Sequence, residues 1–169
     1  NRKHLYKDNP QENMLVVRIG GPAYKIGLGG GFSSSVDQDG TRKEFELSAV
    51  QRGDPQMENK LNRVIKSLID MEDDNPIVSI HDQGAGGLAN VVKEIVYPNG
   101  AEIILDNVTL GDLSLHPLEI WCSEFQESDV LLIKSNNIHI LERVCKRENV
   151  ICDVIGTIKN TGNILVKYK

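Results

Sequence analysis

The residues from Ile80 to Leu88 carry the strongest chemical signal in the sequence. Asp82 follows a predicted strand over residues 77–81, and Gly84, Gly86 and Gly87 stand just before a predicted helix over residues 88–96. Glycines let a backbone approach a ligand closely, and a helix N-terminus offers unpaired N–H groups to an anion. A carboxylate at a strand end suits Mg²⁺, which takes few protein ligands beside phosphate oxygens and water. The pattern predicts a metal and phosphate site; a tight connection in which the carboxylate only caps the helix explains it equally well.

A second glycine-rich stretch runs from Gly27 to Gly31 and is followed by three serines. Gly29 and Gly30 are candidates for wrapping a phosphate, because their backbone donors can approach it closely. A simple chain reversal is the better explanation for this stretch taken alone. Neither the spacing of a Walker loop nor that of a dinucleotide fingerprint is present.

Polar residues around position 51 offer ligand contacts just before a long helix. Gln51 has both a donor and an acceptor, which suits an amide or a ribose hydroxyl. Arg52 suits a phosphate. Asp54 followed by Pro55 is better explained as a helix N-cap and first helical position.

The segment from Glu119 to Glu127 combines three carboxylates and a glutamine with two aromatic residues. The polar side chains would suit ribose hydroxyls or an amide, whereas we expect Trp121 and Phe125 in the core. His81 could act as a general base, but a structural role at a strand end is the simpler expectation. Cys122 has no base partner in the sequence and is not proposed as a nucleophile.

The alternation of strand and helix patterns predicts an α+β domain with helices on a mixed sheet. A hairpin over the last two strands is expected, because Asn160-Thr161-Gly162-Asn163 separates them. The predicted strands cover residues 14–19, 23–28, 77–81, 101–105, 129–133, 152–158 and 164–168, and the predicted helices begin at Pro55, Leu88, Pro117 and near Asn137.

Length and composition fit one globular domain. We expect residues 1–13 to form a polar N-terminal segment and residues 14–169 to form a single domain. A net charge of -5 argues against nucleic acid or an anionic membrane as partner. The cysteines form no paired pattern, so a reducing, cytoplasmic setting is expected. The polar start without an initiator methionine suggests a piece of a larger enzyme.

Four segments in this order resemble phosphoribosylformylglycinamidine synthases of the large, single-chain type. The resemblance runs from about Met14 to the end of the chain, and an ordered set is more specific than any one segment. The segments are Gly20–Gly31, Ala49–Pro55, His81–Gly87 and Glu119–Glu127.

The resemblance implies a place and a fold for the chain. It is similar to the C-terminal half of the first of two aminoimidazole-ribonucleotide-synthetase-like units, a three-layer α/β/α domain that is partly ferredoxin-like. Its expected partners are the N-terminal nucleotide-binding half, the second unit and a glutaminase domain. The implied reaction is the ATP- and glutamine-dependent conversion of formylglycinamide ribonucleotide to formylglycinamidine ribonucleotide in purine synthesis, catalysed by a carbon–nitrogen ligase.

The resemblance also implies roles for single residues. Gln51 matches a substrate-contacting glutamine and Asp82 a magnesium-binding aspartate, whereas Glu124, Phe125 and Gln126 match a stretch that contacts the ribonucleotide. The compact bacterial form has serine where this chain has Phe125, so only a backbone contact would be kept there. The family's catalytic histidine, its main ATP-binding loops and its glutaminase cysteine have no match. We therefore expect no catalytic residue here and no synthase activity from this chain alone.

Two other functions remain open at this level. The same fold could serve a related ATP-dependent enzyme, such as a selenophosphate synthetase, a thiamine-monophosphate kinase or a hydrogenase-maturation protein. The glycine-rich loops could also belong to a non-catalytic module that only packs against a partner domain.

Overall fold

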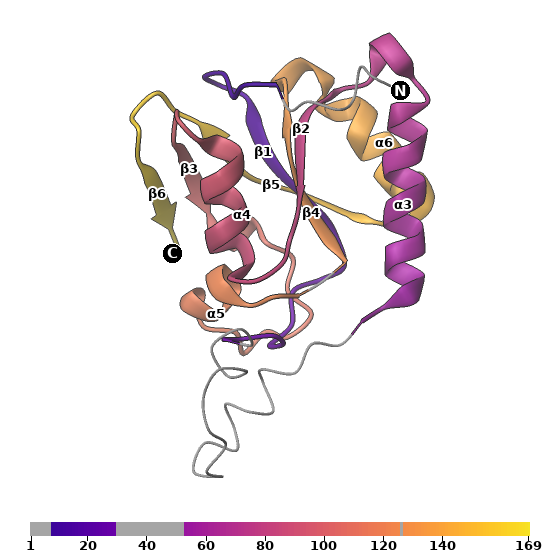
Figure 1. Ribbon diagram of the computed structural model, residues 1–169. Helices are drawn as coiled ribbons and strands as arrows, with labels where there is room; N and C mark the ends of the chain where they lie inside the picture. The colour runs from indigo at the N-terminus through magenta and orange to yellow at the C-terminus, as the bar shows by residue number, and fades with distance from the viewer. Residues whose placement is uncertain (1–7, 30–52, 126) are drawn as a thin grey trace, which may run out of the picture.

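The computed structural model describes residues 8–29, 53–125 and 127–169. A mixed six-stranded sheet in the order β2-β4-β1-β5-β3-β6 runs through the molecule, with helices on both faces (Figure 1). The strands are β1 (Leu15–Gly20), β2 (Ile77–Asp82), β3 (Ala101–Ile104), β4 (Ser128–Ile133), β5 (Ile151–Ile158) and β6 (Ile164–Lys167), and the helices are α3 (Pro55–Ile69), α4 (Gly87–Val96), α5 (Pro117–Cys122) and α6 (Ile138–Glu148).

Among the described residues, four of the six strands and two of the four α-helices form a ferredoxin-like unit. β1, α3 and β2 form one strand-helix-strand unit, and β4, α6 and β5 form the second. Their strands lie in the order β2-β4-β1-β5, and each neighbouring pair is antiparallel. This interleaving of two units is the ferredoxin-like arrangement. α4, β3 and α5 are inserted between the two units, so the expected partly ferredoxin-like, α+β domain is confirmed.

The two faces of the sheet carry separate apolar cores, which gives the three layers. All six residues of β4 are buried, and they alternate between the faces because successive strand side chains point in opposite directions. Val130 and Leu132 pack with α4 in one core. Leu131 and Ile133 pack with α3 and α6 in the other. None of the described helices is long and apolar enough to span a membrane.

The start of α3 has the predicted cap. Asp54 Oδ1 accepts hydrogen bonds from the backbone N–H groups of Gln56 and Met57, both at 3.0 Å. Pro55 occupies the first helical position, where its missing N–H costs nothing. The predicted N-cap is confirmed, and it fixes where the chain enters α3 beside the end of β2.

The predicted C-terminal hairpin is wrong. Residues 151–158 and 164–167 are strands, but β3 lies between them, antiparallel to β5 and parallel to β6. Gly100 makes this possible: its φ is +88°, and a Cβ there would lie 2.3 Å from the carbonyl oxygen of Asn163. Strand and turn patterns in the sequence define elements but not partners, and here a segment about sixty residues upstream takes the place between the two strands.

The predicted strand over residues 23–28 is also wrong. Ala23 forms only an isolated parallel bridge with Leu110, and the rest of residues 21–29 is loop. Gly27 and Gly29 have φ values of +64° and +66°, a left-handed conformation that an extended strand excludes. This loop reaches the end of the sheet where β2 stops and α4 begins.

Candidate functional site

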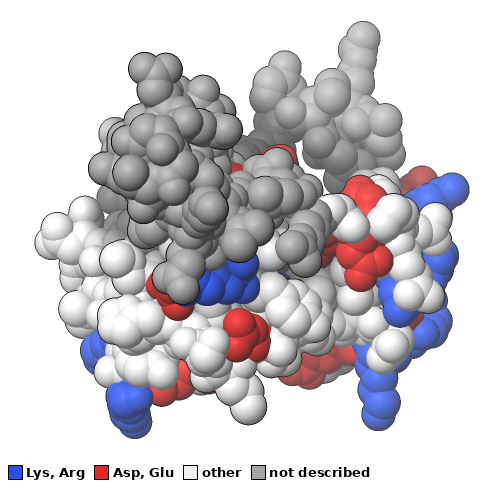
Figure 2. Space-filling view, turned by 90° about the horizontal axis from the view of Figure 1, so that it is seen from below, with Lys and Arg blue, Asp and Glu red and all other residues white. Residues whose placement is uncertain are grey.

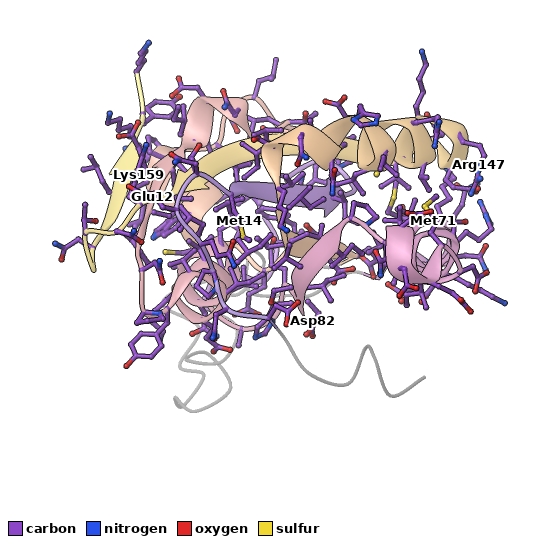
Figure 3. The ribbon with its side chains drawn as sticks, turned by 90° about the horizontal axis from the view of Figure 1, so that it is seen from above. Glu12, Met14, Met71, Asp82, Arg147 and Lys159 are labelled. Atoms are coloured by element: carbon purple, nitrogen blue, oxygen red, sulfur yellow. The ribbon has the colours of Figure 1, made fainter. Side chains whose placement is uncertain are left out.

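A pocket of about 360 Å³ lies where β2 ends and α3 begins. Asp82 stands at its rim with a side chain that is 91% exposed. Figure 3 shows Asp82 at the margin of the molecule, away from Met14, whose side chain lies in the core. The carboxylate predicted as a metal ligand is thus accessible. The pocket is lined by Glu58, Leu61, Asn62, Ile65, Asp82, Gln83, Gly84, Glu127, Ser128 and Asp129.

Four of the lining side chains are carboxylates, and they differ in environment. Asp129 is directly opposite Asp82 in the β2–β4 pairing and is only 8% exposed. Burial, with the nearby charges of Asp82 and Glu58, raises the pKa of Asp129 to about 7, although His81 acts in the opposite direction. Figure 2 shows both acidic and basic side chains on this lower face of the molecule, but the described residues that line the pocket include neither lysine nor arginine. The pocket therefore has a negative field that a cation would offset.

The residues fit a magnesium ion held by few protein ligands. In residues 8–29, 53–125 and 127–169, no group of three or more histidine, cysteine, aspartate or glutamate side chains is arranged to hold a metal. Mg²⁺ commonly takes one or two carboxylates and completes its shell with phosphate oxygens and water. The exposed oxygens of Asp82 suit that arrangement, whereas a closed all-protein metal site is not built by these residues.

The three glycines after Asp82 have different surroundings. Gly87 N–H donates to the Gly84 carbonyl oxygen at 3.0 Å, and a Cβ on Gly87 would lie 2.3 Å from the Ser123 carbonyl oxygen. Gly86 is the N-cap of α4, and its N–H donates to Glu124 Oε1 at 3.1 Å. A Cβ on Gly84 would have nothing within 4 Å. Of these three phosphate candidates, Gly84 is the one with open space beside it.

Glu124 joins the loops that surround the site. Its side chain is 3% exposed, and its carboxylate supplies the anionic acceptor at the start of α4. Its backbone N–H donates to the Ile26 carbonyl oxygen at 3.1 Å, and a Cβ on Gly27 would lie 2.6 Å from the Glu124 Cβ. A substrate contact by Glu124 would therefore involve a residue that is already fixed between two glycine-rich loops.

Phe125 lies in the core as expected, and Trp121 packs against it. Phe125 is 2% exposed, and Trp121 is partly buried against the same core. The ring of Phe125 lies 4.8 Å from the Arg18 guanidinium carbon. The side chain of Phe125 points away from solvent, so a ligand contact at this position would come from the backbone.

Several predicted site residues lie outside the described residues: Gly30, Gln51, Arg52 and Gln126. Gly29 is half-buried at the end of the loop over residues 21–29. A second hollow of about 520 Å³ borders that loop and the start of α3, and it is lined by Tyr24, Lys25, Ile26, Gly53, Asp54, Pro55 and Asp112.

His81 is tied into the structure through both ring nitrogens. Nε2 lies 2.6 Å from Glu94 Oε2, and Nδ1 lies 2.8 Å from the Asp82 carbonyl oxygen. The hydrogen bond with His81 is the main reason that the pKa of Glu94 is lowered. These contacts agree with the expected structural role of His81. Burial raises the pKa of the Cys122 thiol, which keeps it protonated and unsuited to nucleophilic attack.

The sequence did not point to Asp129 or Glu94. Asp129 is the one charged residue of β4, and it follows Ser128 at the start of a strand whose other four residues are apolar, which is a usable signal of a strand end near a polar site. Glu94 follows Asn90 by four positions on α4, and Asn90 Nδ2 donates to Glu94 Oε1 at 2.9 Å. That spacing places both on one helix face, but nothing in the sequence links the face to His81.

Comparisons with known proteins agree on one family. Residues 11–169 match the model described as AIR synthase related protein, C-terminal domain. A probable phosphoribosylformylglycinamidine synthase of Arabidopsis thaliana, named chloroplastic/mitochondrial, is 52% identical over 94% of this chain and 11% of its own length. The Homo sapiens phosphoribosylformylglycinamidine synthase is 46% identical over 96% of this chain and 12% of its own length. The chain thus spans about a ninth of the curated relatives it matches.

A solved structure shows the same fold. Thermotoga maritima PurL complexed with FGAR superposes with a TM-score of 0.86 and covers 100% of this chain and 28% of its own, at 24% identity. At that identity the likeness shows the fold alone.

Proposed function

Because the chain belongs to the family of AIR synthase-related C-terminal domains, we propose that it is the substrate- and magnesium-binding domain of a phosphoribosylformylglycinamidine synthase. The complete enzyme would convert formylglycinamide ribonucleotide to formylglycinamidine ribonucleotide with ATP and glutamine. The observation that carries the proposal is the exposed Asp82 carboxylate beside the open Gly84, at the rim of an acidic pocket. Relatives that are 46% and 52% identical over nearly the whole chain carry the synthase name, which does not favour another enzyme of this fold.

The proposed chemistry needs a substrate amide held firmly beside a phosphate donor. ATP phosphorylates the amide oxygen, which makes it a good leaving group, and ammonia from glutamine then displaces phosphate to form the amidine. A magnesium ion supplies charge neutralisation at the transferring phosphoryl group when it is bound. Asp82 would hold that ion, while the backbone at Gly84 and at Phe125 would orient the ligand.

Other parts of a longer chain would complete the reaction. Gln51 and Gln126 stay predicted substrate contacts from the family resemblance. ATP would bind mainly to the N-terminal half, because the family's main nucleotide-binding loops have no match in this sequence. A relative, Thermotoga maritima PurL, has been solved complexed with ATP. The second synthetase-like unit and the glutaminase domain are proposed partners, in keeping with relatives of which this chain covers 11% and 12%.

The compartment and the domain boundary are proposals too. All three cysteines are free, which suits a reducing setting such as the cytoplasm. The Arabidopsis thaliana relative is named chloroplastic/mitochondrial, so an organelle is the competing location. Imaging of the tagged full-length protein separates the two. The single domain over residues 14–169 stays a prediction.

The proposal is tested with Asp82→Asn in the full-length enzyme. We expect the magnesium concentration for half-maximal amidine formation to rise at least about 10-fold, because loss of even a residue that only supports a metal ligand typically costs about 10- to 100-fold in metal affinity. Asp70→Asn is the matched control, because Asp70 is an exposed aspartate at the other end of α3. Wild-type magnesium dependence in the Asp82 variant would contradict the proposal and favour a structural module instead.

A further inference from the structure

A buried cation lies where three segments of the site meet. Arg18 on β1 is 0% exposed, and its Nη1 lies 3.0 Å from Asp153 Oδ2. Its Nη2 donates to the carbonyl oxygen of Gly21, the start of the loop over residues 21–29. The guanidinium carbon lies 4.8 Å from the ring centroid of Phe125. One side chain thus contacts the sheet, the loop over residues 21–29 and the predicted substrate-contacting segment.

The partner of Arg18 extends these contacts to a fourth segment. Asp153 Oδ2 accepts from the Thr109 backbone N–H at 2.9 Å, and Oδ1 accepts from the Thr109 hydroxyl at 2.8 Å. The Thr109 carbonyl oxygen in turn accepts from the Ala23 N–H at 2.9 Å. The ion pair is therefore linked through Thr109 to residues 108–112. From there it is linked back to the loop over residues 21–29, which Arg18 also contacts directly.

Stability alone does not explain a full charge in this place. Burial lowers the pKa of Arg18 to about 10, although Asp153 acts in the opposite direction, so the guanidinium stays charged at neutral pH. A buried ion pair is often no more stable than apolar residues of the same size, because removing both charges from water is costly. The planar guanidinium of Arg18 has hydrogen-bond donors in fixed directions. It therefore fixes the Gly21 carbonyl and the Asp153 carboxylate relative to the Phe125 ring.

We propose that Arg18 is a positioning residue that holds Phe125, and through it Glu124, in the arrangement that receives the ribonucleotide. The inference rests on the proposed function. Phe125 follows Glu124 directly, and the Glu124 carboxylate accepts from Gly86 at the start of α4. A shift of the Phe125 ring would therefore move both the predicted substrate-contacting backbone and the turn that follows Asp82. Small misplacements of this kind can change rates by about two orders of magnitude.

The test uses the full-length enzyme with Arg18→Met combined with Asp153→Asn, so that neither charge is left buried without its partner. We expect a folded protein whose KM for the ribonucleotide rises about 10-fold or more, with an unchanged KM for glutamine. The single variant Arg18→Lys keeps the positive charge but not the forked donor geometry of arginine. Its KM for the ribonucleotide should therefore rise less than that of the double variant. Arg63→Met is the control, because that exposed arginine pairs with Glu148 between α3 and α6.

A folded double variant with wild-type KM for the ribonucleotide would overturn the proposal. If the Arg18 variants do not fold, Phe125→Leu carries the test, since it keeps the ion pair and much of the apolar volume. The same rise in KM is then expected, and a wild-type KM overturns the proposal.

A second measurement separates this inference from the proposed function. If the wild-type enzyme has no activity on the ribonucleotide, the proposed function fails. The positioning role is then read from amide hydrogen exchange at Gly86 and Glu124, whose N–H groups donate within the site. Faster exchange in the double variant but not in Arg63→Met supports the role, and unchanged exchange overturns it.

Discussion

Replacing Asp129 by asparagine should stabilise the domain, and the gain should depend on pH. Asp129 is 8% exposed, and burial with the nearby charges of Asp82 and Glu58 raises its pKa from 3.8 to about 7. Because the folded-state pKa is higher than the unfolded one, the contribution of Asp129 to stability is complete below about pH 4. It is lost as the pH rises towards 7 and stays lost above that. Asparagine has a similar shape and cannot ionise, so it avoids this loss.

The size of the effect follows from the two pKa values. A difference of about 3 units corresponds to about 4 kcal/mol at about 1.4 kcal/mol per unit. This is an upper value, because pocket water can screen part of the charge. We therefore expect Asp129→Asn to be about 2 to 4 kcal/mol more stable than wild type at about pH 8, with a difference near zero at about pH 4.

The measurement is urea unfolding of the 169-residue chain at several pH values between these limits. The fluorescence of Trp121, the only tryptophan, reports the transition because its side chain packs against the core. Asp70→Asn serves as an exposed control and should follow wild type throughout. An Asp129 variant that is less stable than wild type at about pH 8, or a difference that does not change with pH, would refute the reasoning.

Two further predictions concern single positions near the site. Gly87→Ala should destabilise the domain by about 2 kcal/mol or more, because φ is +58° and the new Cβ would clash with the Ser123 carbonyl oxygen. Gly84→Ala is its control and should change the free energy of unfolding by less than about 1 kcal/mol, and equal losses would contradict the packing argument. Asp54→Ala should cost about 1 kcal/mol in chemical denaturation, because two backbone N–H groups at the start of α3 lose their acceptor. An unchanged unfolding midpoint would mean that the cap contributes nothing.

Short-range sequence patterns correctly predicted the helices and strands that neighbouring residues alone determine. α3 has its cap, its proline and one apolar face within fifteen residues. β4 is recognisable as a short apolar run. The position of β3 was beyond such patterns, because it depends on Gly100 lying against Asn163, far along the chain. Backbone pairing partners are chosen by the whole sheet, so a turn-like tetrapeptide between two strands does not define a hairpin.

The same limit applies to the site. Asp82 was recognisable because a carboxylate, a strand end and a glycine turn are adjacent in the sequence. Glu124 is one of the polar residues of Glu119–Glu127 that suited a ligand, but no local pattern predicts its contact with Gly86, which spans 38 positions. Arg18 sits inside an apolar strand, where its neighbours suggest no role beyond burial. Its importance becomes visible only when Asp153 and Phe125 are brought beside it.

The acidic lining of the pocket has a thermodynamic consequence for any ligand that carries a phosphate. Among the described residues that line it are four carboxylates and neither lysine nor arginine, while the start of α4 already has Glu124 as its counter-charge. A phosphate that enters alone meets repulsion, and a divalent ion that enters first removes it. Ion and ligand are therefore reciprocally linked, so that each raises the affinity of the other by the same factor.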